Sequence, residues 1–167
     1  MSTISYLTEA RCNIFCELGT KEEVLEYLST ILVEGSSVET CYDDDSRFII
    51  LVVNNEVSIK FSVSLQEKGG DRTAKVLLGA SNFIRNIETD AACNKDYIDE
   101  CLDECNAFIG IHALPVLSVD YGHVAYLEKM TEHFEGLIFN GVAFLDCNGR
   151  MILNSDGECT VLYEERG

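Results

Sequence analysis

The feature that most constrains this chain is the stretch of residues 48–65, FIILVVNNEVSIKFSVSL. Its first part, residues 48–53, is apolar throughout, which is typical of a strand covered on both faces. Asn54 and Asn55 then predict a tight turn. From residue 56 onwards, apolar and polar residues alternate strictly, so this second strand has one buried and one wet face. We therefore expect an antiparallel hairpin at the centre of a sheet. Its wet face carries Ser64 and, as bystanders to any function, Glu56, Ser58, Lys60 and Ser62.

Apolar residues at helical spacing predict helices at about 21–33, 73–87 and 123–134, and a fourth helix that starts at Asn94 or Asp96. Thr20 and Glu23 form a capping-box pair before the helix at 21–33, and Gly136 ends the helix at 123–134. Short apolar runs between turn residues predict strands at 13–17, 38–42, 108–112, 137–139, 142–145 and 151–153, with 160–163 as a further candidate.

The resulting order begins β-α-β-β-β-α-α-β-α and ends in a run of short strands. Runs of neighbouring strands mixed with helices are typical of the α+β class. The length of 167 residues suits one domain. We predict a single α+β domain over residues 1–167, in which about four helices pack on a mainly antiparallel or mixed sheet.

The formal net charge is −17, from 29 acidic and 12 basic residues. Such a surface repels nucleic acid and anionic membranes, and it favours either a basic partner or simply solubility. No run approaches the roughly 18 apolar residues of a membrane helix, and the N-terminus lacks the basic start and apolar run of a signal peptide. We expect a cytoplasmic protein that binds neither nucleic acid nor membrane. The oligomeric state is left open.

Eight cysteines stand at positions 12, 16, 41, 93, 101, 105, 147 and 159. The expected compartment favours reduced thiols over a disulfide framework. Cys101 and Cys105 share one face of the predicted fourth helix with Ile98 and Leu102, and Cys93 lies nearby. Structural zinc needs closely spaced pairs that complete a tetrahedron, and no such second pair is present. We interpret these cysteines, and the pair at 12 and 16, as core residues, and we predict no metal site and no cofactor.

The histidines do not identify a catalytic site. His112 lies in a predicted strand and is interpreted as a hydrogen-bonded core residue, whereas His123 and His133 lie near the two ends of a predicted helix, where the helix dipole favours the latter. Pairing eight thiols with three imidazoles would be arbitrary. Glu128 and Glu132 are four residues apart but lack the companion Glu-x-x-His motif, so we interpret them as a solvated helix face. No phosphate-binding loop is present, and no catalytic residue is predicted.

Acidic residues concentrate around the predicted fourth helix, where residues 88–106 contain seven acids and one base. Like charges at helical spacing destabilise a helix by about 0.2–0.5 kcal/mol per pair, so an interaction that offsets this cost is expected. A solvated face is the alternative to a docking surface for a basic protein. The candidate partner-binding residues are Asp96, Asp99, Glu100, Asp103 and Glu104, together with the acidic turn of Asp43, Asp44 and Asp45.

Two resemblances bear on function. Residues 123–156 resemble uncharacterised bacterial domains in which a helix leads into a Gly-Leu-x-Phe strand and a Phe-Leu-Asp-x-x-Gly hairpin, here residues 136–139 and 144–149. In size, acidity and lack of a catalytic motif, the chain also resembles the small immunity proteins of bacterial contact-dependent and polymorphic toxin systems. That resemblance implies a non-enzymatic inhibitor, and it carries over no individual residue.

The leading hypothesis is a binding module, an immunity protein that occludes the active site of a basic bacterial toxin domain such as a nuclease. Its acidic helix would occupy a cationic cleft that otherwise takes phosphates. Two alternatives stay open. The first is a small enzyme or ligand-binding domain with a pocket near His112, His123 or Tyr121, and the second is a structural, oligomerising module.

Overall fold

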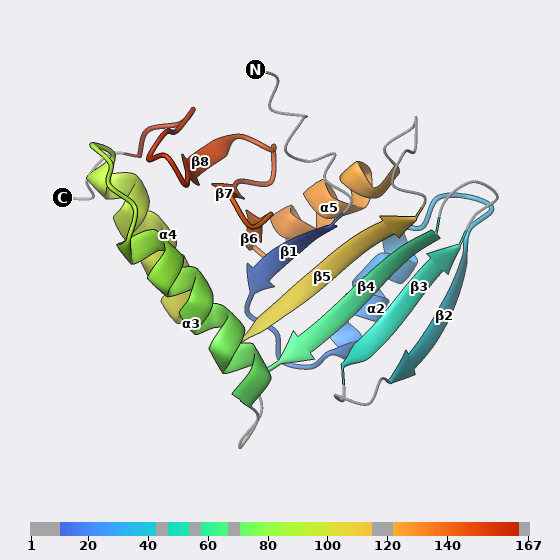
Figure 1. The fold of residues 1–167 in the computed structure, drawn as a ribbon. Coiled ribbons are helices and arrows are strands. Elements are labelled where there is room, and N and C mark those ends of the chain that lie inside the picture. Colours follow the sequence, from blue (N-terminus) through green and yellow to red (C-terminus); the bar gives the residue numbers. More distant parts are fainter. Residues whose placement is uncertain (1–10, 43–46, 54–57, 67–70, 115–121, 164–167) are drawn as a thin grey trace.

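The structure, a computed structural model, describes residues 11–42, 47–53, 58–66, 71–114 and 122–163. These residues form one eight-stranded sheet with helices on both faces (Figure 1). The predicted α+β class is therefore confirmed. In chain order the elements are β1 (Arg11–Cys16), α2 (Glu22–Ile31), β2 (Ser37–Tyr42), β3 (Phe48–Val53), β4 (Ser58–Leu65), α3 (Asp71–Arg85), α4 (Ala92–Glu104), β5 (Ala107–Leu114), α5 (Gly122–His133), β6 (Leu137–Phe139), β7 (Ala143–Leu145) and β8 (Met151–Asn154).

The sheet has the strand order β2-β3-β4-β5-β1-β6-β7-β8, and every pairing is antiparallel. The N-terminal strand β1 lies near the middle, between β5 and β6. The expected hairpin is confirmed, because β3 pairs with β4 from Phe48 opposite Val63 to Val53 opposite Ser58. The predicted turn at Asn54 and Asn55 lies outside the described residues. The meander β2–β3–β4 and the three short C-terminal strands are also present.

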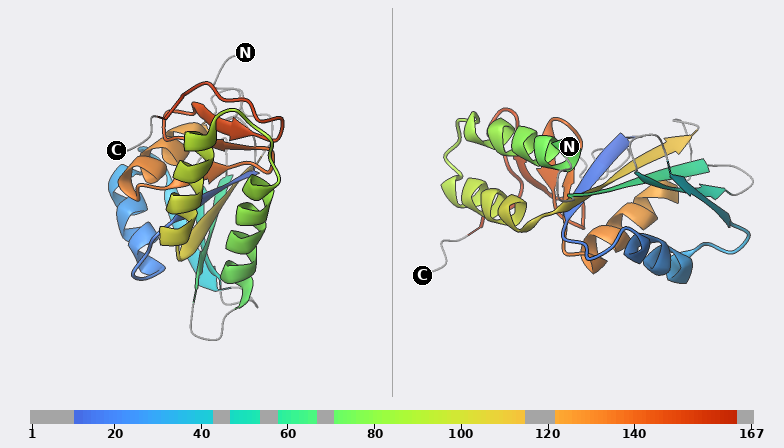
Figure 2. Two further views of the ribbon diagram at one scale, coloured as in Figure 1. Left: turned by 90° about the vertical axis from the view of Figure 1, so that its left-hand side faces the viewer. Right: turned by 90° about the horizontal axis from the view of Figure 1, so that it is seen from below.

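Helices cover the two faces of the sheet over different strands. Figure 2 shows α2 and α5 on one side, and α3 with α4 on the other, displaced towards β6–β8. Two apolar cores result, one on each face of the sheet, and β1 contributes to both. Ile14 packs in the first core with Phe61 and Leu127, and Phe15 packs in the second core with Ile98. In the described part of the chain, most of the β2–β5 face opposite α2 and α5 carries no helix (Figure 1).

This layering modifies two expectations for the hairpin. In β3, Ile49 is buried, but Leu51 and Val53 are only half-buried, since α3 and α4 do not extend over them. In β4, Ser64 was expected to be wet and is 4% exposed instead. Its end of the strand contacts α3. The predicted alternation holds from Ser58 to Val63, and Leu65, which was expected to be buried, is half-buried.

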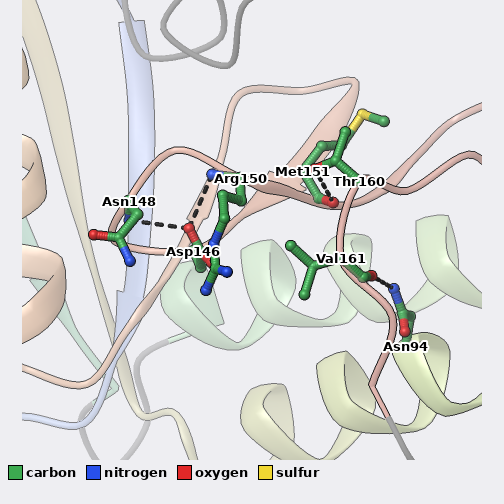
Figure 3. Close-up of polar contacts among 7 residues, drawn as sticks. All are labelled: Asn94, Asp146, Asn148, Arg150, Met151, Thr160 and Val161. Carbon is green, nitrogen blue, oxygen red and sulfur yellow. Dashed lines mark hydrogen bonds and ion pairs between the residues drawn. The ribbon is translucent and has the colours of Figure 1, made fainter.

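The C-terminal segment differs from the prediction, because residues 160–163 form no strand. Instead, the backbone N–H of Thr160 donates to Met151 at 2.9 Å and that of Tyr163 donates to Asn94 Oδ1 at 2.9 Å. Asn94 was a candidate for the start of α4, but it lies inside the helix and is fully buried. Its Nδ2 donates to the carbonyl oxygen of Ile152 at 2.7 Å. The same Nδ2 donates to the carbonyl oxygen of Val161 at 2.6 Å (Figure 3). One amide therefore ties α4 to β8 and to the C-terminal segment.

The end of α5 also differs from expectation. The residue with a left-handed backbone is Glu135, with φ of 51°, and not Gly136. The N–H of Gly136 closes the helix by donating to Thr131 O at 2.9 Å. A Cβ at Gly136 would lie 2.7 Å from both Ile14 Cγ2 and the backbone oxygen of Phe15. The glycine thus serves the close approach to β1, and the strained position, which costs roughly 1–2 kcal/mol, falls to Glu135. At the start of α2, the Thr20 N–H donates to Glu23 Oε1, which is one half of the predicted capping box.

Candidate functional site

The acidic residues predicted for partner binding lie on α4, with the exception of Asp43, Asp44 and Asp45, which are outside the described residues. Ile98 and Leu102 bury one side of the helix against the sheet. Successive residues of a helix are 100° apart around its axis. The predicted acids therefore lie on two different sides of the α4 surface that is not buried. Glu100 and Glu104 lie on the side of Tyr97 and Cys101. The remaining side carries Asp96 and Asp103, which are exposed, and Asp99, which is half-buried.

The side of α4 with Glu100 and Glu104 forms one wall of a cleft of about 500 Å³. The opposite wall consists of the end of α5 and the residues that lead into β6, and the turn between β7 and β8 closes one side. We call this site the acidic cleft. Five of its lining residues are carboxylic acids. The acidic cleft is lined by Tyr97, Glu100, Cys101, Glu104, Thr131, Glu132, Glu135, Gly136, Asp146 and Cys147.

Asp146 differs from the other four acids because its carboxylate already accepts hydrogen bonds from residues of its own turn. Its Oδ1 accepts the backbone N–H groups of Asn148 and Arg150, both at 2.9 Å, and its Oδ2 accepts Arg150 Nε at 2.7 Å (Figure 3). These bonds hold the carboxylate in place at the edge of the cleft, where its side chain is 14% exposed. Asp146 therefore fixes the shape of the cleft more than it adds negative charge.

The four glutamates of the cleft carry the charge that remains. In the described part of the chain, no lysine or arginine forms an ion pair with any of them. Glu100 and Glu104 come from α4, Glu132 and Glu135 come from the end of α5 and the segment after it, and all four line the same opening. Their mutual repulsion is unfavourable without a cation between the walls, so the arrangement suits a positively charged group.

The thiols and the phenol around the cleft respond to this environment. Burial, and then the carboxylates of Asp146 and Glu132, raise the pKa of Cys147. Burial, followed by the neighbouring Cys101 and Glu104, raises the pKa of Cys105 to about 12. Burial is also the main cause of the raised pKa of Tyr97, whose ring stacks on Tyr163 with centroids 4.2 Å apart. The environment therefore disfavours anions, including the thiolate that nucleophilic catalysis needs.

Sequence reasoning missed three of the acids in this cleft. Glu132 was interpreted as part of a solvated helix face, Asp146 only as a turn residue, and Glu135 was not considered. Nothing in the sequence links them to Glu100 and Glu104, since α4 and the end of α5 are brought together only by packing on the sheet. The single sequence signal was the acidic density of α4 itself.

The cysteines and histidines occupy separate places. None of the eight cysteines, all of which lie in the described ranges, forms a disulfide, and Cys12 and Cys16 are buried in the first core, as predicted. Cys101 and Cys105 are half-buried and pack against the second core, and Cys101 also lines the acidic cleft. Within the described residues, no group of three or more His, Cys, Asp or Glu side chains is arranged to hold a metal ion.

Of the histidines, His133 stacks on Tyr27 with ring centroids 3.8 Å apart. The side chain of His123, like the whole of Tyr121, is outside what the structure describes. His112, expected in the core, is half-buried and lines a hollow of about 260 Å³ on the sheet. The described residues that line this hollow include no carboxylate and no thiol that would pair with the imidazole.

No helix in the described ranges combines the length and the apolar character that a membrane crossing requires. No family model, curated protein or solved structure matches this chain.

Proposed function

We propose that this protein binds a basic protein partner, and that the acidic cleft receives a lysine or arginine side chain of that partner. The observation that carries the proposal is the convergence of Glu100 and Glu104 with Glu132 and Glu135 around one opening. A cation inserted between these walls gains charge-assisted hydrogen bonds from both. It also relieves the repulsion within α4 that the sequence alone predicts.

The exposed acids on the outer side of α4 extend the negative surface beyond the cleft. Asp96 and Asp103 would guide a basic partner towards the opening, because complementary fields raise association rates. Together with the charge of −17, this arrangement supports an immunity protein that acts in the bacterial cytoplasm. In this proposal it is not an enzyme, and it occludes the cationic active site of a toxin domain. The raised thiol pKa values favour such a binding role over cysteine catalysis.

The test starts from the genes that neighbour the gene of this chain, where the proposal expects a toxin with a basic C-terminal domain. The association of that domain with the purified protein is measured by surface plasmon resonance, together with survival of cells that express both. The double variant Glu100→Lys/Glu104→Lys should weaken binding on the order of a hundredfold, because close interfacial charge pairs contribute several kcal/mol, and cells should no longer survive.

The matched control is Glu26→Lys/Glu34→Lys, which makes the same change in charge at exposed positions on and after α2. This control should bind within a few-fold of wild type, since it changes only long-range attraction. The proposal fails if the neighbouring domain does not bind, or if the two double variants lose equal affinity.

A further inference from the structure

The open face of the sheet carries a second site whose chemistry is opposite to that of the acidic cleft. A hollow of about 260 Å³ lies over β4, β5 and β1, on the part of this face that α3 and α4 leave uncovered in the described chain (Figure 1). We call it the basic hollow. It gathers two of the twelve lysines and arginines of a strongly acidic chain. The basic hollow is lined by Asn13, Arg47, Lys60, Ser62, Phe108, Gly110, Ile111 and His112.

The strand register explains why these residues meet. Lys60 of β4 lies directly opposite His112 of β5, and in the next row Ser62 lies opposite Gly110, which in turn lies opposite Asn13 of β1. Directly opposed side chains of an antiparallel pair share one face and lie about 5 Å apart. Three groups that can donate hydrogen bonds, an ammonium, an imidazole and a hydroxyl, therefore gather around one point, with the Asn13 amide beside them.

These four side chains are partly shielded from water and are not engaged by the described part of the fold. The side chains of Asn13, Lys60, Ser62 and His112 are all half-buried. Within the described residues, none of these side chains takes part in a hydrogen bond or ion pair. Half-buried donors without acceptors lose hydration without compensation. An acceptor-rich group placed among them would satisfy the donors of Lys60, Ser62 and His112.

Gly110 leaves room for a ligand at the floor of the basic hollow, because it has no side chain. Its backbone does not have the left-handed conformation that requires glycine, and a glycine inside a strand is destabilising by roughly 0.5–1 kcal/mol relative to alanine. A Cβ here would stand 3.2 Å from Asn13 Oδ1 and 3.7 Å from Ser62 Cβ, at the floor of the hollow. In strand interiors, such a glycine often marks the close approach of a ligand.

We propose that the basic hollow binds a small molecule that carries an oxyanion, either a phosphate or a carboxylate. The oxyanion accepts from the Lys60 ammonium, the His112 imidazole and the Ser62 hydroxyl above Gly110, and the adjoining ring of Phe108 offers an apolar wall to the rest of the ligand. This site is on a different part of the sheet from the acidic cleft, and the inference does not depend on the proposed function.

The experiment is a titration of the isotope-labelled chain, followed by amide NMR at constant ionic strength. Inorganic phosphate and citrate are added in parallel, with chloride as the reference salt. Saturable shifts should concentrate at Asn13, Ser62 and Gly110. The anion that saturates at the lower concentration identifies the oxyanion as phosphate or carboxylate, and either result supports the site.

Three variants decide whether the hollow itself is responsible. Lys60→Gln should weaken binding about tenfold or more, because a hydrogen bond to a charged group is lost. Lys129→Gln makes the same charge change at an exposed position of α5, on the opposite face, and should bind like wild type. Gly110→Ala should abolish binding while the unfolding midpoint stays close to that of wild type. The inference is overturned if chloride causes the same shifts, or if the two lysine variants lose equal affinity.

Discussion

The acidic cleft and the basic hollow are assembled in different ways. The cleft takes its residues from α4, the end of α5 and the β7–β8 turn, so it exists only because helices and a turn pack together. The hollow takes most of its residues from directly paired positions of β1, β4 and β5, so it depends on strand register. A net charge of −17 alone would suggest a uniform surface, whereas the fold separates an anionic site from a cationic one.

This difference predicts that the two sites can be disturbed independently. Changes at the contacts that hold α4 should damage the cleft and leave the hollow intact. Changes in the central strands should do the reverse.

The largest effect is expected for Asn94→Ala. The variant removes three hydrogen bonds, a buried one to Ile152 and partly buried ones to Val161 and Tyr163, and leaves backbone groups unsatisfied. We expect the free energy of unfolding to fall by about 3 kcal/mol, measured by urea denaturation. The α4 wall of the cleft should loosen, while phosphate-induced shifts in the hollow should persist.

Asn86→Ala is the control for Asn94→Ala. Its Nδ2 also donates to a carbonyl oxygen, that of Asn82 at 2.9 Å, but on an exposed surface. This variant should change stability by less than about 0.5 kcal/mol. Equal losses in the two variants would show that Asn94 does not anchor α4.

The two glycines of the two sites give the next largest contrast. Gly136→Ala should cost about 2 kcal/mol, because the new methyl group meets the backbone oxygen of Phe15, which cannot move aside. The free energy of unfolding of Gly110→Ala should stay within about 0.5 kcal/mol of wild type. Alanine lowers the conformational entropy of the unfolded chain, and this gain offsets the cost of a small shift of Asn13. Thermal and urea unfolding measure both, and a reversed order would contradict the described packing.

A smaller effect should appear in the dependence of stability on pH. Burial and nearby negative groups raise the pKa of Cys105 from 9.0 to about 12 in the folded chain. Between these values the unfolded chain loses the proton while the folded chain keeps it, so the free energy of unfolding falls as pH rises. Below about pH 9 the full contribution is present.

Cys105→Ala removes this titration, and urea unfolding across the same pH range should show a shallower decline than in wild type. Other groups with raised pKa values, such as Cys16 and Tyr97, keep part of the slope. A decline as steep as that of wild type would show that the Cys105 thiol is not held protonated by the fold.

Much of the fold could be predicted from the sequence because local patterns determine it. The alternation within residues 56–65 and the helical spacing elsewhere placed most strands and helices within a few residues of their observed bounds. The insertion of β1 between β5 and β6 could not be predicted, because it depends on pairing between distant segments. Residues 160–163 have strand-like composition, but hydrogen bonds from Thr160 and Tyr163 to distant residues determine their course.

The candidate sites were less accessible to sequence reasoning. Acidic density identified Glu100 and Glu104, but only the packing of α5 against the sheet brings Glu132 to the same opening. Lys60 and Ser62 were expected to be bystanders on a wet strand face, because their register partners Gly110 and His112 lie far along the chain. Cross-strand register carries the information that sequence alone lacks.

The most direct test of the acidic cleft maps a short lysine peptide onto the isotope-labelled chain by amide NMR. We predict saturable shifts that concentrate at Glu100, Glu104 and Gly136, with Glu26 and Glu34 unmoved apart from the effect of matched chloride. Shifts of equal size at all of these positions would show that cations are attracted by net charge alone, and would contradict a specific cleft.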